Sequence, residues 1–163
     1  MTSQDIHAAL GAFHRAIAEE TGPQKPWQAL QALAQQIVGA KLFTVTTVDL
    51  DAEVARRLYT NMPEAYPVSG TKPITVDPWF EQVVIGKQLF VANTLEAIAG
   101  HFPDWELIGS LGCRSCINMP VFVRGKVLGT VNMLDVEGHF TPERVTLVEH
   151  LRIPAIAAFL AAR

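Results

Sequence analysis

The sequence predicts an α+β fold, in which helices and loops cover both faces of an antiparallel β-sheet. Strand-like segments rich in β-branched and aromatic residues occur between residues 42 and 136. Segments with the apolar spacing of helices stand at both ends of the chain. A short connection containing glycine joins the two longest strand segments, which indicates an antiparallel hairpin. We therefore expect the N- and C-terminal helices on one sheet face, and the loops and short helices of the middle on the other.

Length and composition fit one globular domain. The chain has 163 residues, of which 49% are hydrophobic and 18% charged, and no change in composition divides it. We expect a single domain over residues 1–163. Its N-terminal helices should lie in 1–40, its sheet and pocket insertions in 41–140, and its C-terminal helix in 141–163.

Charge and hydropathy argue against several classes of partner. The net charge is -3 and the basic residues form no run, which disfavours a nucleic-acid partner. No apolar stretch is long enough to span a membrane, and the N-terminus lacks the basic and apolar regions of a signal peptide. We therefore expect a cytoplasmic protein without a membrane partner, in which Cys113 and Cys116 stay reduced.

The N-terminal region predicts two helices. Residues 2–21 place apolar side chains at helical spacing, and Thr2 or Ser3 can cap this helix. A second helix begins at Pro26, because proline is favoured in the first helical turn. It ends at Gly39, which readily adopts the left-handed conformation that closes many helices.

Two strands and a long loop follow. Residues 42–50 are expected to form the first strand, and residues 53–60 to return as an edge strand exposed on one side. Residues 61–78 contain four prolines and are expected to form a loop. Loops of this length without structure of their own are uncommon and often functional.

The segments before the central hairpin are short. We expect a helix over 79–86, a strand over 87–93, a helix over 94–99 and a second helix from Asp104 to about Leu111. Asp104 is a natural N-cap residue for this second helix.

The central hairpin is expected to join a strand at 115–123 to one at 127–136, and each carries a buried asparagine, Asn118 or Asn132. If residues 124–126 form a three-residue loop, the asparagines face each other on one side of the sheet, and with a two-residue loop they lie on opposite faces. We expect three residues. The final helix then begins at 141–142.

A kink is expected near Leu151, because Pro154 removes a hydrogen bond of that final helix.

The hairpin carries the residues of a known family pattern. An apolar strand enters a proline at Met119-Pro120-Val121, a glycine turn and second strand follow at residues 125–129, and Asn132-Met133-Leu134 and Phe140-Thr141 complete the pattern. With this pattern, the chain from about residue 42 to residue 160 resembles the GAF domain family. The resemblance implies a GAF/PAS-like antiparallel sheet of five to six strands and a pocket under the segments inserted before the hairpin. It also implies dimerisation through the terminal helices.

Two specialised GAF patterns are not matched. Bilin-binding members carry a Cys-His dipeptide, whereas Cys113 precedes Arg114 and Cys116 precedes Ile117. The spaced motif of the cyclic-nucleotide-binding members cannot be assembled from this sequence either.

The candidate ligand-binding residues come from the hairpin and from the segments expected to roof the pocket. Asparagines inside apolar strands need partners or a ligand, and aromatic roof residues can stack on a flat ligand or fill a core. The candidates are Tyr66, Lys72, Trp79, Phe80, Phe102, Trp105, Cys116, Asn118, Thr130 and Asn132.

Cys113 and Cys116 form a C-x-x-C pair with two interpretations. They can pack as small hydrophobic residues or line the pocket, or they can act as redox residues. The second interpretation resembles the free methionine-(R)-sulfoxide reductase, a GAF-fold enzyme that uses several spaced cysteines. His7 and His14 lie seven residues apart, a spacing that does not favour a metal pair on a helix, and we expect no metal.

The leading hypothesis is a sensory domain that binds an unknown small organic molecule, with no resident cofactor. It would form a homodimer and act through a separate signalling partner. The alternatives are a small redox enzyme that uses Cys113 and Cys116, and a structural dimerisation module with a filled core.

Overall fold

The computed structural model describes all 163 residues. The chain divides into two compact units, one formed by Met1–Gly39 with Pro142–Arg163 and the other by Ala40–Thr141. The expectation of a single domain over residues 1–163 stays a prediction. No helix of the structure combines the length and the apolar character needed to cross a membrane.

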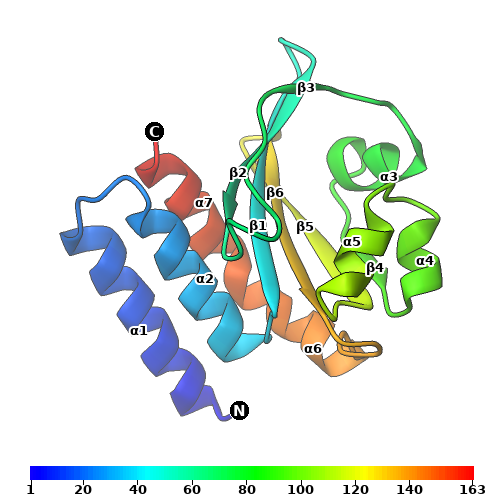
Figure 1. Cartoon of the computed structure of the whole chain (residues 1–163). Coiled ribbons are helices and arrows are strands. Elements are labelled where there is room, and N and C mark those ends of the chain that lie inside the picture. The colour runs from blue at the N-terminus through cyan, green and yellow to red at the C-terminus, as the bar shows by residue number, and fades with distance from the viewer. The chain divides into compact units, whose positions relative to one another are not determined.

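The terminal unit is entirely helical (Figure 1). Its elements are α1 (Ser3–Glu19), α2 (Lys25–Ile37), α6 (Pro142–Leu147), the 3-10 helix η2 (Val148–Leu151) and α7 (Arg152–Ala161). Thr2 caps α1 as predicted, because its hydroxyl oxygen accepts the Asp5 N–H at 3.1 Å. Gly39 has φ 85° just beyond α2, in agreement with the expected helix end.

The last helical segment changes helix type close to the position of the expected kink, and the kink itself stays a prediction. The 3-10 helix η2 interrupts the α-helical pattern up to Leu151, and α7 begins at Arg152. Pro154 has no N–H to donate to the carbonyl of His150, which is its normal helical acceptor.

The second unit contains the sheet. Its strands are β1 (Leu42–Asp49), β2 (Val54–Thr60), β3 (Lys72–Pro73), β4 (Phe90–Ala92), β5 (Ser115–Val123) and β6 (Lys126–Asp135). Its helices are α3 (Pro78–Phe80), the π-helical turn η1 (Glu81–Ile85), α4 (Leu95–Ala99) and α5 (Trp105–Ser110). The six strands pair in the order β3-β2-β1-β6-β5-β4, and every pairing is antiparallel. Helices α3, α4 and α5 gather on one side of this sheet (Figure 1).

The prediction that residues 53–60 form the edge strand was wrong in one respect. The outermost strand is β3, a two-residue strand inside the expected loop, which pairs with Val54 and Ala55 of β2. Further along β2, the N–H of Arg57 donates to Ser69 Oγ (3.0 Å), and the Ser69 N–H donates to the Arg57 carbonyl (3.1 Å). The 61–78 segment therefore continues the sheet edge where a free loop was expected.

The expected helix over 79–86 ends in a wider turn than predicted. After α3, the Gly86 N–H donates to the Glu81 carbonyl at 2.7 Å, a step of five residues. This π-helical step is often found at functional sites. Pattern reading of apolar spacing does not distinguish it from an α-helical turn.

The central hairpin has the predicted register but a different turn. Its turn has two residues, Arg124 and Gly125, with φ of 52° and 78°, as a type I′ turn requires. A two-residue turn alone would put Asn118 and Asn132 on opposite faces. A β-bulge leaves Leu128 without a partner, and this extra residue restores the pairing of Asn118 with Asn132.

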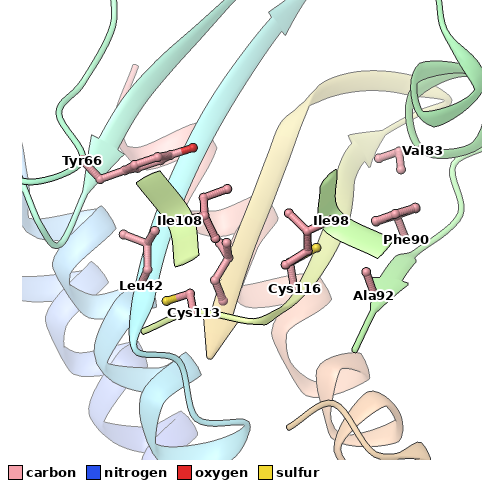
Figure 2. Packing of buried hydrophobic residues seen from close by; sticks show 10 residues of the cluster. Leu42, Tyr66, Val83, Phe90, Ala92, Ile98, Ile108, Cys113 and Cys116 are labelled. Carbon is pink, nitrogen blue, oxygen red and sulfur yellow. The ribbon is translucent and has the colours of Figure 1, made fainter. Parts of the chain in front are cut away.

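Two apolar clusters lie on the same side of the sheet. The larger contains residues of β1, β4, β5 and β6 together with inserted residues such as Ile98 and Ile108 (Figure 2). The smaller one joins Val48 and Val127 to Phe80 and Val84.

Candidate functional site

A cavity of about 150 Å³ lies between the sheet and the inserted segments of the second unit. Its lining comes from four strands, from the 61–78 segment and from three inserted segments. These residues are Thr44, Thr46, Arg57, Tyr66, Trp79, Phe102, Asp104, Ile108, Cys116, Asn118, Thr130, Asn132 and Leu134. A space of this volume has room for about one benzene ring.

The floor of the cavity is a continuous chain of hydrogen bonds across three strands. The indole N–H of Trp79 donates to the Asn118 amide oxygen (2.9 Å), and the Asn118 amide N–H donates to the Asn132 oxygen (2.9 Å). The Asn132 amide nitrogen then donates to the hydroxyls of Thr44 (3.1 Å) and Thr46 (3.3 Å). Every donor points the same way, so the bonds polarise one another.

Strand register builds this floor. Asn118 of β5 pairs with Asn132 of β6, and Asn132 pairs with Thr44 of β1. Paired residues project on the same face of an antiparallel sheet, so the three polar side chains form one row. Asn118 is 4% and Asn132 9% exposed, and the chain of bonds offsets the cost of burying these amides.

One wall of the cavity is charged. The Tyr66 hydroxyl donates a hydrogen bond to the Asp104 carboxylate, and Arg57 Nη2 lies 3.8 Å from Asp104 Oδ2. The Arg57 guanidinium also stacks on the Tyr66 ring, with 3.8 Å between the guanidinium carbon and the ring centroid. Burial and the bond to Asp104 raise the pKa of the Tyr66 phenol well above its ordinary value.

Asp104 therefore does not cap α5 as predicted. It occupies the N-cap position but makes no side-chain hydrogen bond to the helix. The reason is that its carboxylate turns to Tyr66 and Arg57, so this wall links the 61–78 segment, β2 and the start of α5.

Aromatic and apolar groups complete the enclosure. Trp79 and Phe102 meet edge to face, with ring centroids 6.1 Å apart. Ile108, Cys116 and Leu134 supply apolar lining and belong to the larger cluster. The cavity thus joins an amide and hydroxyl floor to an aromatic side, an arrangement typical of small-ligand pockets.

The structure brings seven of the ten predicted ligand-binding residues together around the cavity: Tyr66, Trp79, Phe102, Cys116, Asn118, Thr130 and Asn132. The other three do not line it. Lys72 lies in the exposed strand β3, Phe80 packs in the smaller cluster with Val84, and Trp105 packs on the outside of the larger cluster. Their placement removes the geometric reason for assigning them to the site.

Sequence reasoning missed part of the lining. In the sequence, Thr44 and Thr46 look like ordinary β-branched strand residues, and Arg57 looks like a polar residue of an exposed edge strand. All three line the cavity. The alternation of β1 does place Thr44 and Thr46 on one face. What the sequence lacks is the pairing of β1 with β6, which aligns these threonines with Asn132 and Thr130.

Cys113 and Cys116 are both free and fully buried. Burial raises the pKa of the Cys113 thiol, and it raises the pKa of the Cys116 thiol to about 12. Figure 2 shows the Cys113 sulfur on the Leu42 side and the Cys116 sulfur beside Ile98. Because the thiolate is the reactive form, this geometry favours packing over redox chemistry.

The family comparison agrees with the fold and with the hairpin pattern. The sequence model of the GAF domain family matches residues 23–153. The chain belongs to the GAF domain family. GAF domains are mostly sensory domains that bind small molecules within larger signalling proteins. No curated protein matches the chain.

Solved structures similar to this GAF domain share its fold at low identity. The GAF domain of a two-component sensor histidine kinase from Bacillus halodurans has a TM-score of 0.69 at 10% identity, over 86% of this chain and 95% of that one. The GAF domain of a phosphoenolpyruvate-protein phosphotransferase from Coxiella burnetii has a TM-score of 0.69 at 15% identity, over 99% and 95%. Free methionine-R-sulfoxide reductase from Neisseria meningitidis has a TM-score of 0.63 at 17% identity, over 100% and 95%. These likenesses establish the GAF fold and leave the ligand open.

Proposed function

We propose that this GAF domain is a sensory domain that binds one small organic molecule in the cavity above Asn118 and Asn132. The observation that carries the proposal is the directed hydrogen-bond chain, which ends in threonine hydroxyls at an open cavity. A module with a purely structural role has no need for a buried polar row beside a space of this size.

Signalling would pass through the 61–78 segment to a separate partner. Two hydrogen bonds hold this segment. Tyr66 donates to Asp104 at the start of α5, and Arg57 Nη1 donates to the Pro67 carbonyl at 2.9 Å. A ligand that contacts this wall changes how firmly the segment is held. Its order then differs between the empty and the occupied state, which a partner protein can detect.

Native mass spectrometry of the freshly purified protein tests the binding. We expect extra mass on the native protein that disappears on denaturation, or a rise in melting temperature with one component of a metabolite panel. Asn118→Leu should abolish the rise because it interrupts the floor, whereas Cys113→Ser and Cys116→Ser should retain it. An empty cavity and no thermal response to any compound would contradict the proposal.

The redox alternative predicts a different outcome in the same variants. A methionine sulfoxide reductase activity that disappears in both single Cys→Ser variants would replace the sensory proposal. The burial and raised thiol pKa values of Cys113 and Cys116 give no support to that activity.

We also propose that the protein forms a homodimer through its helical unit. Ile153 and Leu160 of α7 are 79% and 44% exposed, and with Ile156 and Ala157 they recur at the spacing of one helix face. Light scattering should give the mass of a dimer, and Ile153→Glu should give a monomer that still binds ligand. A monomer mass for the unmodified protein at high concentration would contradict the dimer. A cytoplasmic location stays a prediction.

A further inference from the structure

Three cavity side chains stand in one row across three neighbouring strands. Thr130 of β6 pairs with Thr46 of β1, and Thr46 pairs with Arg57 of β2. All three line the cavity. Because paired residues project on the same face, two hydroxyls and a guanidinium lie side by side next to the amide row.

Thr130 is a buried hydroxyl without a protein partner. The residue is 1% exposed, and its Oγ1 makes no hydrogen bond. Every fully enclosed side-chain nitrogen or oxygen in the protein has a partner. The Thr130 hydroxyl is therefore not fully enclosed, and the space that it borders is the cavity. A polar group in this position is satisfied only by water or by a ligand.

The floor supplies a second hydroxyl donor. The Thr46 oxygen accepts from the Asn132 amide, so the hydroxyl proton of Thr46 is free to point elsewhere. Since all donors of the chain point toward the threonines, the chain ends in a donor. The complementary ligand atom at this end is a hydrogen-bond acceptor.

Arg57 brings a guanidinium to the same place, where its positive charge faces the Asp104 carboxylate. Its Nη1 donates to the Pro67 carbonyl, but its Nη2 lies 3.8 Å from Asp104, which is too long for a hydrogen bond. The guanidinium therefore keeps donors that an anionic oxygen can use, and guanidinium groups bind carboxylates in the strongest side-chain hydrogen bonds.

We propose that the cavity binds a small monocarboxylate, with its carboxylate held by Thr130, Thr46 and Arg57. The apolar part of the ligand lies against Trp79 and Phe102. This inference rests on the proposed sensory function and names its ligand class. A simple carboxylic acid and an α-amino acid both supply the carboxylate, and only the second supplies an ammonium group for Asp104.

Three probes of matched shape test the ligand class: isovalerate, its neutral amide isovaleramide, and L-valine. Ligand-observed saturation-transfer NMR on the full chain measures their binding through the methyl signals. We expect isovalerate to bind at least about tenfold more tightly than isovaleramide, since charged hydrogen bonds are about twice as strong as neutral ones. Tighter binding of L-valine than of isovalerate would support the carboxylate subsite with Asp104 as ammonium partner. Equal or weaker binding of L-valine would support it for a simple acid.

Threonine variants test the subsite. Thr130→Val keeps the shape and removes the hydroxyl, so we expect isovalerate affinity to fall about tenfold, and Thr130→Ser to retain it. Arg57→Met should abolish binding. Thr47→Val is the matched control, because Thr47 does not line the cavity and its hydroxyl donates to the Arg56 carbonyl.

Three results would overturn the subsite. The first is equal binding of isovalerate and isovaleramide, and the second is unchanged affinity in Thr130→Val when circular dichroism shows that the variant is folded. The third is failure of both isovalerate and L-valine to bind. The sensory proposal would survive each of these results if native mass spectra or the metabolite panel still show an occupied cavity, so the two failures are distinguishable.

Discussion

Two ends of one sheet face differ in what covers them. At one end, Val48 and Val127 meet Phe80 and Val84 in an apolar cluster. Two residues earlier in β1, Thr46 lines the cavity, and its hydroxyl accepts a hydrogen bond from the Asn132 amide. The strands are the same at both ends. The difference shows that side-chain identity at alternate strand positions, together with the helix above them, decides whether the face becomes core or pocket.

The largest loss of stability is expected at the packed end of the sheet face, the apolar cluster of Val48, Phe80, Val84 and Val127. Phe80 is 6% exposed, so Phe80→Ala should remove about 3–5 kcal/mol from the free energy of unfolding, through lost burial and an unfilled cavity. Urea denaturation measures this loss. Binding of isovalerate should be unchanged in the folded variant, because Phe80 does not line the cavity.

A loss below about 1 kcal/mol for Phe80→Ala would mean that the packed end tolerates voids as the cavity end does. If Phe80→Ala instead lost ligand binding at unchanged stability, the ligand would bind at the Phe80 end, and the cavity end would be the packed one. Phe80→Leu is the matched control, since it keeps most of the apolar volume.

The floor of the cavity should show the next largest effect. Asn132→Leu has similar volume but removes three hydrogen bonds and leaves an Asn118 N–H without its acceptor. We expect a loss of about 2–3 kcal/mol together with loss of ligand binding. The double variant Asn118→Leu/Asn132→Leu should cost less than the sum of the single variants, because both partners of one bond are then absent. Strict additivity would show that the two amides do not act as one network.

The sequence predicted the part of the cavity lining that comes from the central hairpin, because those residues lie in two adjacent strands. Asn118, Asn132, Cys116 and Thr130 follow from the alternation of two strands and from one register. The expected register is correct, but the turn that produces it is not the expected one. The loop was expected to have three residues, and the structure instead uses a two-residue turn and the bulge at Leu128. Both arrangements add one residue on the same side of the hairpin, so their effect on register is equal.

The wall was harder to predict because it depends on contacts between distant segments. Arg57, Tyr66 and Asp104 come from a strand, a long segment and a helix start, and only Tyr66 was a candidate. Asp104 matched a local capping pattern, and the tertiary contact with Tyr66 replaced that local role. Trp79 and Phe80 differ for a similar reason. Neighbours on a helix point about 100° apart, and apolar spacing alone does not fix the rotation of so short a helix.

The buried thiol beside the cavity predicts a dependence of stability on pH. The pKa of Cys116 rises from 9.0 to about 12 on burial, so above about pH 9 the unfolded chain loses a proton that the folded chain keeps. The free energy of unfolding must then fall as pH rises, by about 1.4 kcal/mol per pH unit from this thiol. Urea denaturation at about pH 8 and about pH 10 should show a smaller fall in Cys116→Ala than in the unmodified protein. Equal falls would mean that Cys116 is not enclosed by the apolar side of the cavity.

The smallest loss of stability is expected at the charged wall of the cavity, formed by Arg57, Tyr66 and Asp104. Tyr66→Phe removes only the hydroxyl bond to Asp104, and we expect a loss of about 1 kcal/mol. The Asp104 side chain is 35% exposed, so its carboxylate can turn to water when the phenol is absent and no buried group is left unpaired. Hydrogen exchange should become faster in the 61–78 segment and stay unchanged at the amides of β5 and β6. A loss as large as that of Asn132→Leu, with faster exchange in the hairpin as well, would show that wall and floor unfold together. The 61–78 segment would then not be the part of the protein that responds to a ligand, and the signal would have to pass through the sheet itself.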